Sequence, residues 1–147
     1  MKKGIVAFAI EDRGGYSFNG RSLSKDRLMM EDLQRRIAPC QIVTIDSESM
    51  LMQLSQQEYL LRENDFIKSE ETLVVFANVI LPSQIRKTFS DIKEWDYFLY
   101  RWNRSYPADQ YFSENLALDW ALVSKEDIVG SSHPKITFEH WRKNVDE

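Results

Sequence analysis

Few residues in this sequence have types and spacing that indicate chemistry, and the first candidate is a cation site. Asp46, Ser47 and Glu48 are consecutive and could offer carboxylate and hydroxyl oxygens to a hard divalent cation. Three polar residues after a strand are also a common helix cap, which is the interpretation we favour. His133 and His140 lack cysteine or histidine partners at ligand spacing. The sequence therefore predicts no metal site.

Neither a reactive thiol nor a nucleotide loop is indicated. Cys40 is the only cysteine, so no internal disulfide can form, and no catalytic signature surrounds it. We interpret Cys40 as a small apolar core residue. The turn-rich segment from Gly14 to Gly20 could cradle a phosphate, but it lacks the lysine and the spacing of a P-loop.

Aromatic side chains crowd the segment from Trp95 to Phe112, with Arg101 among them. They could form a platform on which a flat heterocycle stacks, or they could be hydrophobic core and a homodimer face. We favour core plus interface. On a strand, Tyr100 and Trp102 point to the face opposite Arg101, which therefore either faces solvent or enters a pocket. A surface arginine is the simpler interpretation.

Hydrophobic patterning predicts the strands that position these residues. Continuous apolar runs at 4–10 and 72–81 are typical of strands covered on both faces. The segment 11–22 is expected to be a loop, rich in turn-forming residues. Shorter strands are expected at 41–45 and 97–102, and the tail 120–141 predicts a hairpin around Gly130.

Helices are expected between the strands. Ser24 is a plausible N-cap, and Asp26 falls in the first turn, where an anion suits the helix dipole. Apolar residues then recur at intervals of four from Met29 to Ile37, before Pro39 ends the helix. Further helices are expected at 50–61 and 83–92. The alternation predicts one α/β domain with a mostly parallel central sheet and a C-terminal antiparallel hairpin.

Composition narrows the function classes. The chain has 147 residues, 43% of them hydrophobic, and a net charge of −4, which suits one globular domain. Its basic residues are scattered, which argues against a nucleic-acid partner. No stretch approaches the roughly 20 apolar residues of a membrane helix, and the N-terminal apolar run is too short for a signal peptide. We expect a cytoplasmic protein without a membrane partner.

Several fragments, in their order and spacing, resemble the dihydrofolate reductase-like superfamily. The first strand, Ile5–Glu11, and the glycine-bearing loop with Gly15 and Asn19–Gly20 resemble that family's N-terminal region. The riboflavin-biosynthesis reductase domain shares the fold and resembles residues 24–36 equally well, so the superfamily is identified and not the member. The C-terminal fragments are Asp96-Tyr97-Phe98-Leu99-Tyr100, Asp109-Gln110-Tyr111-Phe112-Ser113-Glu114, Trp120-Ala121-Leu122-Val123 and Thr137-Phe138-Glu139-His140-Trp141.

The resemblance implies a single three-layer dihydrofolate reductase-like domain over residues 1–147, with NADPH as its cofactor. Asp26 or Asp32 would then be the catalytic acid, although the family's acid itself aligns with Met29. Carried over by motif, the residues implied to contact substrate are Ile5, Ala7 and Arg101, and those implied to contact cofactor are Ala9, Gly15, Asn19, Gly20, Ala77 and Asn78.

Three departures from the family pattern affect the expected function. Ala77-Asn78 stands where the family has a Gly-Gly pair that lets the backbone approach a pyrophosphate. The segment 44–48 replaces a phosphate-gripping Gly-Arg-x-Thr, and 21–24 replaces a Leu-Pro-Trp.

Three functions therefore remain open. We favour a small-ligand-binding or regulatory domain with a degenerate NADPH site, whose ligand would be a small flat heterocycle. The second hypothesis is an NADPH-dependent reductase acting on dihydrofolate or another pterin-like or pyrimidine-like substrate. The third is an oligomerisation module without a ligand, which would form a homodimer.

Overall fold

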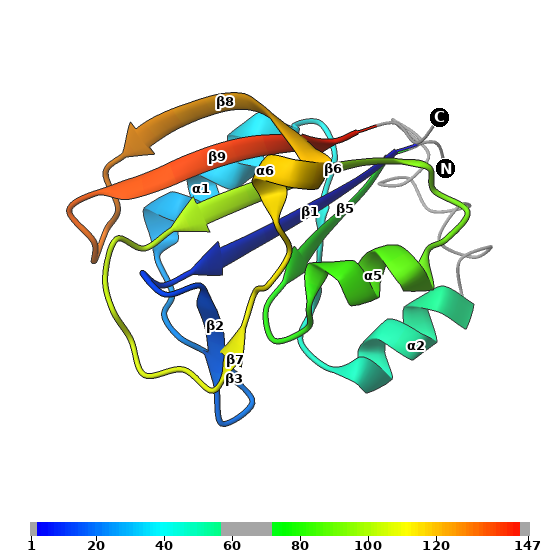
Figure 1. Cartoon of the computed structure of the whole chain (residues 1–147), viewed down its shortest axis with the longest axis horizontal. Coiled ribbons are helices and arrows are strands. Elements are labelled where there is room, and N and C mark those ends of the chain that lie inside the picture. Colours follow the sequence, from blue (N-terminus) through cyan, green and yellow to red (C-terminus); the bar gives the residue numbers. More distant parts are fainter. Residues whose placement is uncertain (1–2, 57–71, 145–147) are drawn as a thin grey trace.

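A computed structural model describes residues 3–56 and 72–144, and Figure 1 traces their elements. None of the helices in these ranges is long and apolar enough for a membrane crossing. The elements in chain order are β1 (Lys3–Ile10), β2 (Gly15–Phe18), β3 (Arg21–Ser22), α1 (Arg27–Ile37), β4 (Ile42–Ile45), α2 (Glu48–Gln56), β5 (Thr72–Ala77), α5 (Pro82–Thr88), β6 (Glu94–Arg101), β7 (Gln110–Tyr111), α6 (Leu116–Asp119), β8 (Trp120–Ile128) and β9 (Ile136–Lys143).

The main sheet has six strands in the order β4-β5-β1-β6-β9-β8. β4, β5, β1 and β6 run parallel, whereas β9 is antiparallel to both β6 and β8. The predicted α/β class, the mostly parallel sheet and the closing hairpin are therefore confirmed.

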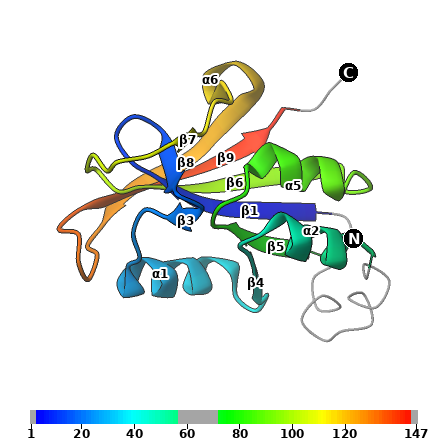
Figure 2. The same ribbon diagram turned by 90° about the horizontal axis from the view of Figure 1, so that it is seen from below.

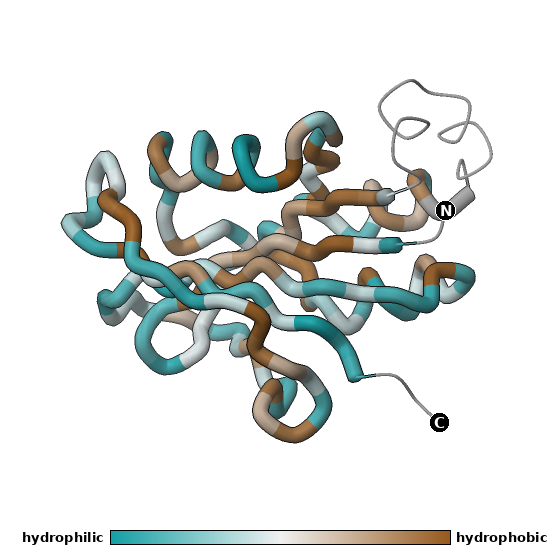
Figure 3. Tube along the Cα trace, turned by 90° about the horizontal axis from the view of Figure 1, so that it is seen from above, coloured by the Kyte–Doolittle hydropathy of each residue, from teal (hydrophilic) through white to brown (hydrophobic). Residues whose placement is uncertain are grey.

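Helices cover both faces of this sheet. Figure 2 shows α1 on one side of β1 and α5 on the other. Because successive strand side chains point to opposite faces, Ile5 and Ala7 of β1 pack under α1, whereas Val6 and Phe8 join the core beneath α2 and α5. In Figure 3 the hydrophobic segments gather in the central strands, and α1 alternates hydrophobic and hydrophilic turns.

The aromatic segment is mostly core. Trp95, Tyr97, Phe98, Tyr100 and Trp102 are buried on the two sides of β6 or just after it. The prediction of core is thus confirmed for these residues, and they present no exposed stacking platform. Cys40, also predicted as core, is half-buried against the cluster beneath α1.

The expected loop at 11–22 is wrong in part, because this segment forms β2 and β3. Together with β7 they make a second, three-stranded sheet in the order β3-β2-β7. Asn19 and Gly20 form the turn between β2 and β3, both with positive φ (52° and 72°). Turn-forming residues therefore made a hairpin here and not an irregular loop.

The residues that cap the first two helices are set by side-chain hydrogen bonds, and one of them differs from expectation. Asp26, and not Ser24, is the N-cap of α1, since its side chain accepts a hydrogen bond from Met29 N. The Ser47 hydroxyl accepts from Met50 N at 3.1 Å, so the predicted cap at the start of α2 is confirmed. Residues 57–61 of the expected second helix lie outside the described residues.

The strand expected at 72–81 ends at Ala77. The residues after Ala77 are apolar although they are not in the strand, because they still pack in the core. Ile80 is buried in the hydrophobic cluster beneath α2 and α5, and Val79 and Leu81 pack against that cluster. The expected helix at 83–92 is shorter and spans Pro82–Thr88.

Gly4 allows the close approach of β1 to Trp95, which lies beside it on β6. A Cβ at Gly4 would lie 2.3 Å from the Trp95 ring. We expect Gly4→Ala to lower the free energy of unfolding by about 1–3 kcal/mol, because the buried ring must shift. Denaturant unfolding measures this loss.

Gly20→Ala is the comparison, since its added Cβ meets no atom within 4 Å and only the positive φ opposes it. Equal unfolding free energies for Gly4→Ala and the wild-type protein would contradict the packing of Trp95 on β1.

Candidate functional site

Asp26, one of the two predicted acids, is buried, and its side chain links α1 to the turn that connects β8 to β9. Its carboxylate accepts hydrogen bonds from Met29 N (3.1 Å), Ser131 N (2.9 Å) and Ser132 N (3.0 Å), and it contacts His133 Nδ1 at 3.0 Å. Burial alone would raise the pKa of Asp26. The hydrogen bonds outweigh burial and hold this pKa well below its usual range.

The turn can approach Asp26 because it contains Gly130. A Cβ at Gly130 would lie 2.5 Å from Asp26 Oδ2. The glycine that predicted a hairpin turn is therefore also required by the contact between the hairpin and α1.

His133 continues the network away from Asp26. Its Nε2 lies 2.7 Å from the Tyr106 hydroxyl and 3.3 Å from Ser24 Oγ, and its ring stacks on Trp102 at 4.5 Å between centroids. When the ring is neutral and its proton is on Nδ1 for Asp26, Nε2 accepts from Tyr106. A serine, a histidine and an aspartate thus lie in series, but the tyrosine already takes the nitrogen that would activate the serine.

Asp32, the other predicted acid, is also buried and also saturated. Its Oδ1 accepts from Arg35 Nη2 at 2.9 Å, and its Oδ2 accepts from Arg36 Nε at 2.7 Å and from the Tyr100 hydroxyl at 2.8 Å. Burial, followed by the neighbouring Asp32 carboxylate, raises the pKa of Tyr100. Arg36 also lies over the Phe138 ring, 3.7 Å from its centroid.

The predicted substrate residues do not share one surface. Ile5 and Ala7 are buried beneath α1 together with Met29. Arg101 lies on the opposite face of the sheet from Tyr100 and forms a two-bond ion pair with Glu139, at 2.7 and 3.2 Å. The side chain of Arg101 is 39% exposed, so the expectation of a surface arginine holds in part, with a carboxylate partner that the sequence did not indicate.

Three of the predicted cofactor residues belong to the small sheet. Gly15 N donates to Glu11 Oε1 at 2.8 Å, and a Cβ at Gly15 would lie 2.4 Å from Ala108 Cβ. This glycine is needed for packing. Asn19 N donates to Asp109 Oδ2 at 3.0 Å, and Gly20 lies exposed beside it at the tip of the hairpin.

The other predicted cofactor residues lie on the parallel strands. Ala9 is half-buried near the end of β1, and Ala77 is buried at the end of β5. Asn78 N donates to Ile45 O at 3.3 Å, which joins the ends of β5 and β4. The structure therefore brings Ala77 and Asn78 next to Ile45.

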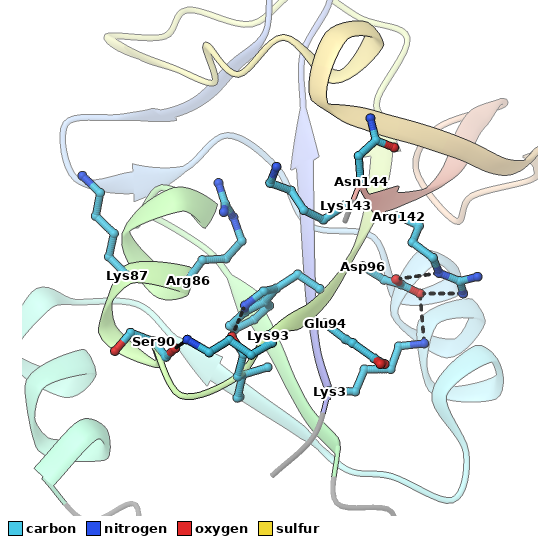
Figure 4. A pocket seen from close by; sticks show the side chains of 12 residues that line it. Lys3, Arg86, Lys87, Ser90, Lys93, Glu94, Asp96, Arg142, Lys143 and Asn144 are labelled. Carbon is cyan, nitrogen blue, oxygen red and sulfur yellow. Dashed lines mark hydrogen bonds and ion pairs between the residues drawn. The ribbon is translucent and has the colours of Figure 1, made fainter. Parts of the chain in front are cut away.

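Sequence reasoning missed a basic hollow of about 940 Å³ at the opposite edge of the sheet, where β1 and β6 begin and β9 ends (Figure 4). Its cationic residues come from three distant segments, which is why they look scattered along the chain. Strand pairing unites them, because Lys3 lies opposite Glu94 and Asp96 lies opposite Arg142. The lining residues are Lys3, Arg86, Lys87, Ser90, Ile92, Lys93, Glu94, Trp95, Asp96, Arg142, Lys143 and Asn144.

A second hollow, of about 570 Å³, lies between α1 and the end of β8. Asp32 and Arg35 line it from the helix, and Ile128 and Val129 line it from the hairpin. Within residues 3–56 and 72–144, no group of three or more histidine, cysteine or acidic side chains is placed to hold a metal ion.

Removal of the Asp26 charge is expected to destabilise the fold. Asp26→Asn keeps the shape of the side chain but weakens its bonds to the hairpin, and we expect a loss of about 2 kcal/mol at pH 7. Because the folded pKa of Asp26 is depressed, its stabilisation is present above pH ~4 and disappears as the pH falls toward the folded pKa. The gap in melting temperature between wild type and Asp26→Asn should therefore narrow below pH ~4.

Asp119→Asn, which changes an exposed carboxylate, is the matched control. A gap between wild type and Asp26→Asn that stays constant from pH 7 to pH 3 would show that the Asp26 charge does not hold the hairpin to α1.

No family model matches this chain, and no curated protein sequence matches it significantly. The function of the chain must therefore be inferred from its own geometry.

Proposed function

We propose that this chain is a small-ligand-binding or regulatory domain on a dihydrofolate reductase-like fold, and that it does not transfer hydride. The observation that carries the proposal is the saturation of both candidate acids. Asp26 accepts from the helix and hairpin backbone, and Asp32 accepts from two arginines and a tyrosine. A general acid must carry a proton and reach substrate, whereas Asp26 is enclosed by its backbone donors, and Asp32, which lines the 570 Å³ hollow, is already bonded to Arg35, Arg36 and Tyr100.

The strand arrangement supports the fold part of the proposal. β1 lies between β5 and β6 in a parallel core, and the C-terminal hairpin adds β9 and β8 outside β6. This agrees with the sheet that the sequence resemblance implies. Fold alone does not establish an activity, so the chemistry of the residues decides between binding and catalysis.

The residues at the ends of β4 and β5 do not fit the pyrophosphate of NADPH. Asp46 and Glu48 put carboxylates where phosphates would need cations, and the Ser47 hydroxyl caps α2. The backbone N–H of Asn78, which could donate to a phosphate, already donates to Ile45 O. A dinucleotide at this edge would meet negative charge and few free donors.

A ligand-binding role has a positive argument as well. The basic hollow, at about 940 Å³, is within the size range of small-molecule sites. The hollow lies at the end of the sheet opposite the ends of β4 and β5. A ligand bound there would not need the phosphate-binding motifs that this sequence lacks.

One observation favours a reductase as the second candidate. Asp32 lies on the first helix and lines the 570 Å³ hollow, so a flat substrate in that hollow could approach a buried carboxylate. In that case Asp32 would have to exchange Arg35 or Tyr100 for the substrate.

The deciding experiment measures NADPH consumption in the presence of dihydrofolate, followed by absorbance. We expect no consumption above the rate without protein, because neither acid is free to protonate a substrate. The experiment measures consumption of NADPH and not its binding. NADPH carries phosphates that the basic hollow could attract, so binding alone would not distinguish a reductase from an anion-binding domain.

Sustained consumption that depends on dihydrofolate and is abolished in Asp32→Asn would overturn the proposal and establish the reductase. Asp119→Asn is again the control, because its carboxylate is exposed and lies outside both hollows.

A further inference from the structure

The basic hollow concentrates positive charge on an acidic protein. Its lining holds six lysine and arginine side chains and two carboxylates, for a formal charge of +4, whereas the whole chain carries −4. A concave surface of one sign focuses its field and attracts small ions of the opposite sign.

One end of the hollow is neutralised internally. Asp96, only 3% exposed, pairs with Lys3 Nζ at 3.1 Å and with Arg142 at 3.2 Å, and it contacts His140 Nε2 at 2.6 Å. Figure 4 shows Lys3 and Arg142 turned toward Asp96. This end has a fixed shape and little charge left for a ligand.

The other end has lysines without carboxylate partners. Among the described residues, Lys87 and Lys143 form no ion pair, and Lys93 Nζ donates only to the Ser90 carbonyl, at 3.0 Å. Lys143 lies 5.8 Å from the Trp120 ring centroid. Each ammonium has three donors, so most of the donors at this end are available to an anion.

Arg86 is already held in position between these lysines and the core. Its Nε donates to the Tyr97 hydroxyl at 2.8 Å, and its Nη2 donates to Glu114 Oε1 at 2.7 Å. The Tyr97 hydroxyl in turn donates to Glu114 Oε2 at 2.6 Å. Glu114 does not line the hollow, and the guanidinium keeps further N–H groups for an anion. A fixed guanidinium loses little entropy on binding.

The wall behind these cations is buried and apolar. Ile92 and Trp95 are buried, and Trp95 Nε1 donates to Ile92 O at 3.0 Å. The cations therefore surround a buried apolar wall, with Arg86 and Lys87 on α5, Lys143 on β9 and Lys93 in the connection between α5 and β6.

We propose that the end of the basic hollow formed by Arg86, Lys87, Lys93 and Lys143 binds a small molecule that carries two or more negative charges on phosphate or carboxylate groups. This names the ligand class for the proposed binding role and rests on it. Among the described residues, Lys87, Lys93 and Lys143 have no carboxylate partner, so these ammonium groups repel one another until an anion is bound. Relief of that repulsion favours a polyanion over a singly charged ion.

The test is a titration of the full chain with pyrophosphate and, separately, with citrate at low ionic strength, measured by calorimetry and by melting temperature. We expect saturable binding of at least one probe, and a rise in melting temperature of a few degrees at saturation. Tighter binding of pyrophosphate supports a phosphate-bearing ligand, and tighter binding of citrate supports a carboxylate-bearing one.

The variant Lys87→Gln/Lys93→Gln/Lys143→Gln should weaken binding of the preferred probe by about tenfold or more. The matched control is Lys25→Gln/Lys125→Gln/Lys135→Gln, which removes the same charge from exposed lysines outside the hollow. We expect the control to weaken binding less than about threefold, through the change in net charge alone.

Two results would overturn the anion site: no saturable binding of either probe at millimolar concentration, or equal weakening in both triple variants. Neither result bears on hydride transfer, because pyrophosphate and citrate carry no nicotinamide. NADPH consumption with dihydrofolate would instead contradict the proposed function, whatever the titration shows.

Discussion

The parallel pairing of β1 with β5 on one side and β6 on the other is the constraint on which the rest of the domain depends. Lys3 to Ala7 pair with both neighbours, so the backbone donors and acceptors of β1 are satisfied in the middle of the sheet. With both edges paired, β1 buries both faces, and helices must cover it from two sides. The same registers set Lys3 beside Glu94 and bring the strand starts together at the edge that becomes the basic hollow.

Buried carboxylates connect the outer layers to this sheet. Asp26 ties α1 to the turn between β8 and β9, Asp32 ties α1 to Tyr100 of β6, and Asp96 ties the start of β6 to Lys3 and Arg142. Glu11 does the same for the segment after β1 by accepting from Arg13 N and Gly15 N, both at 2.8 Å. Hydrogen bonds to charged acceptors are stronger than neutral ones, so each carboxylate helps to fix the geometry between the elements that it joins.

This use of carboxylates bears on function. A protein that kept an acid for proton transfer would leave one oxygen accessible to substrate, as general acid catalysis requires. Here the two acids nearest the expected position are hydrogen-bonded to the backbone, to arginines or to a tyrosine, and several lysines without ion pairs among the described residues line the hollow at the other end of the sheet. The balance of charges favours an anion-binding role over hydride transfer on the same scaffold.

The amino-acid sequence by itself determined the class of fold, because that depends on local patterning. Apolar runs specified the central strands, the intervals of four up to Ile37 specified α1, and Gly130 specified the closing turn. It also indicated a helix cap among Asp46, Ser47 and Glu48, since a cap is formed within a few residues, and Ser47 forms it. Only the tertiary structure decided which charges meet. Asp26 and His133, or Lys3 and Asp96, are separated by most of the chain, and their contact depends on the register of strands and the approach of a hairpin to a helix. Side-chain pairing over such distances has no local pattern, so the saturation of the acids and the convergence of the lysines emerge only when the sheet is assembled.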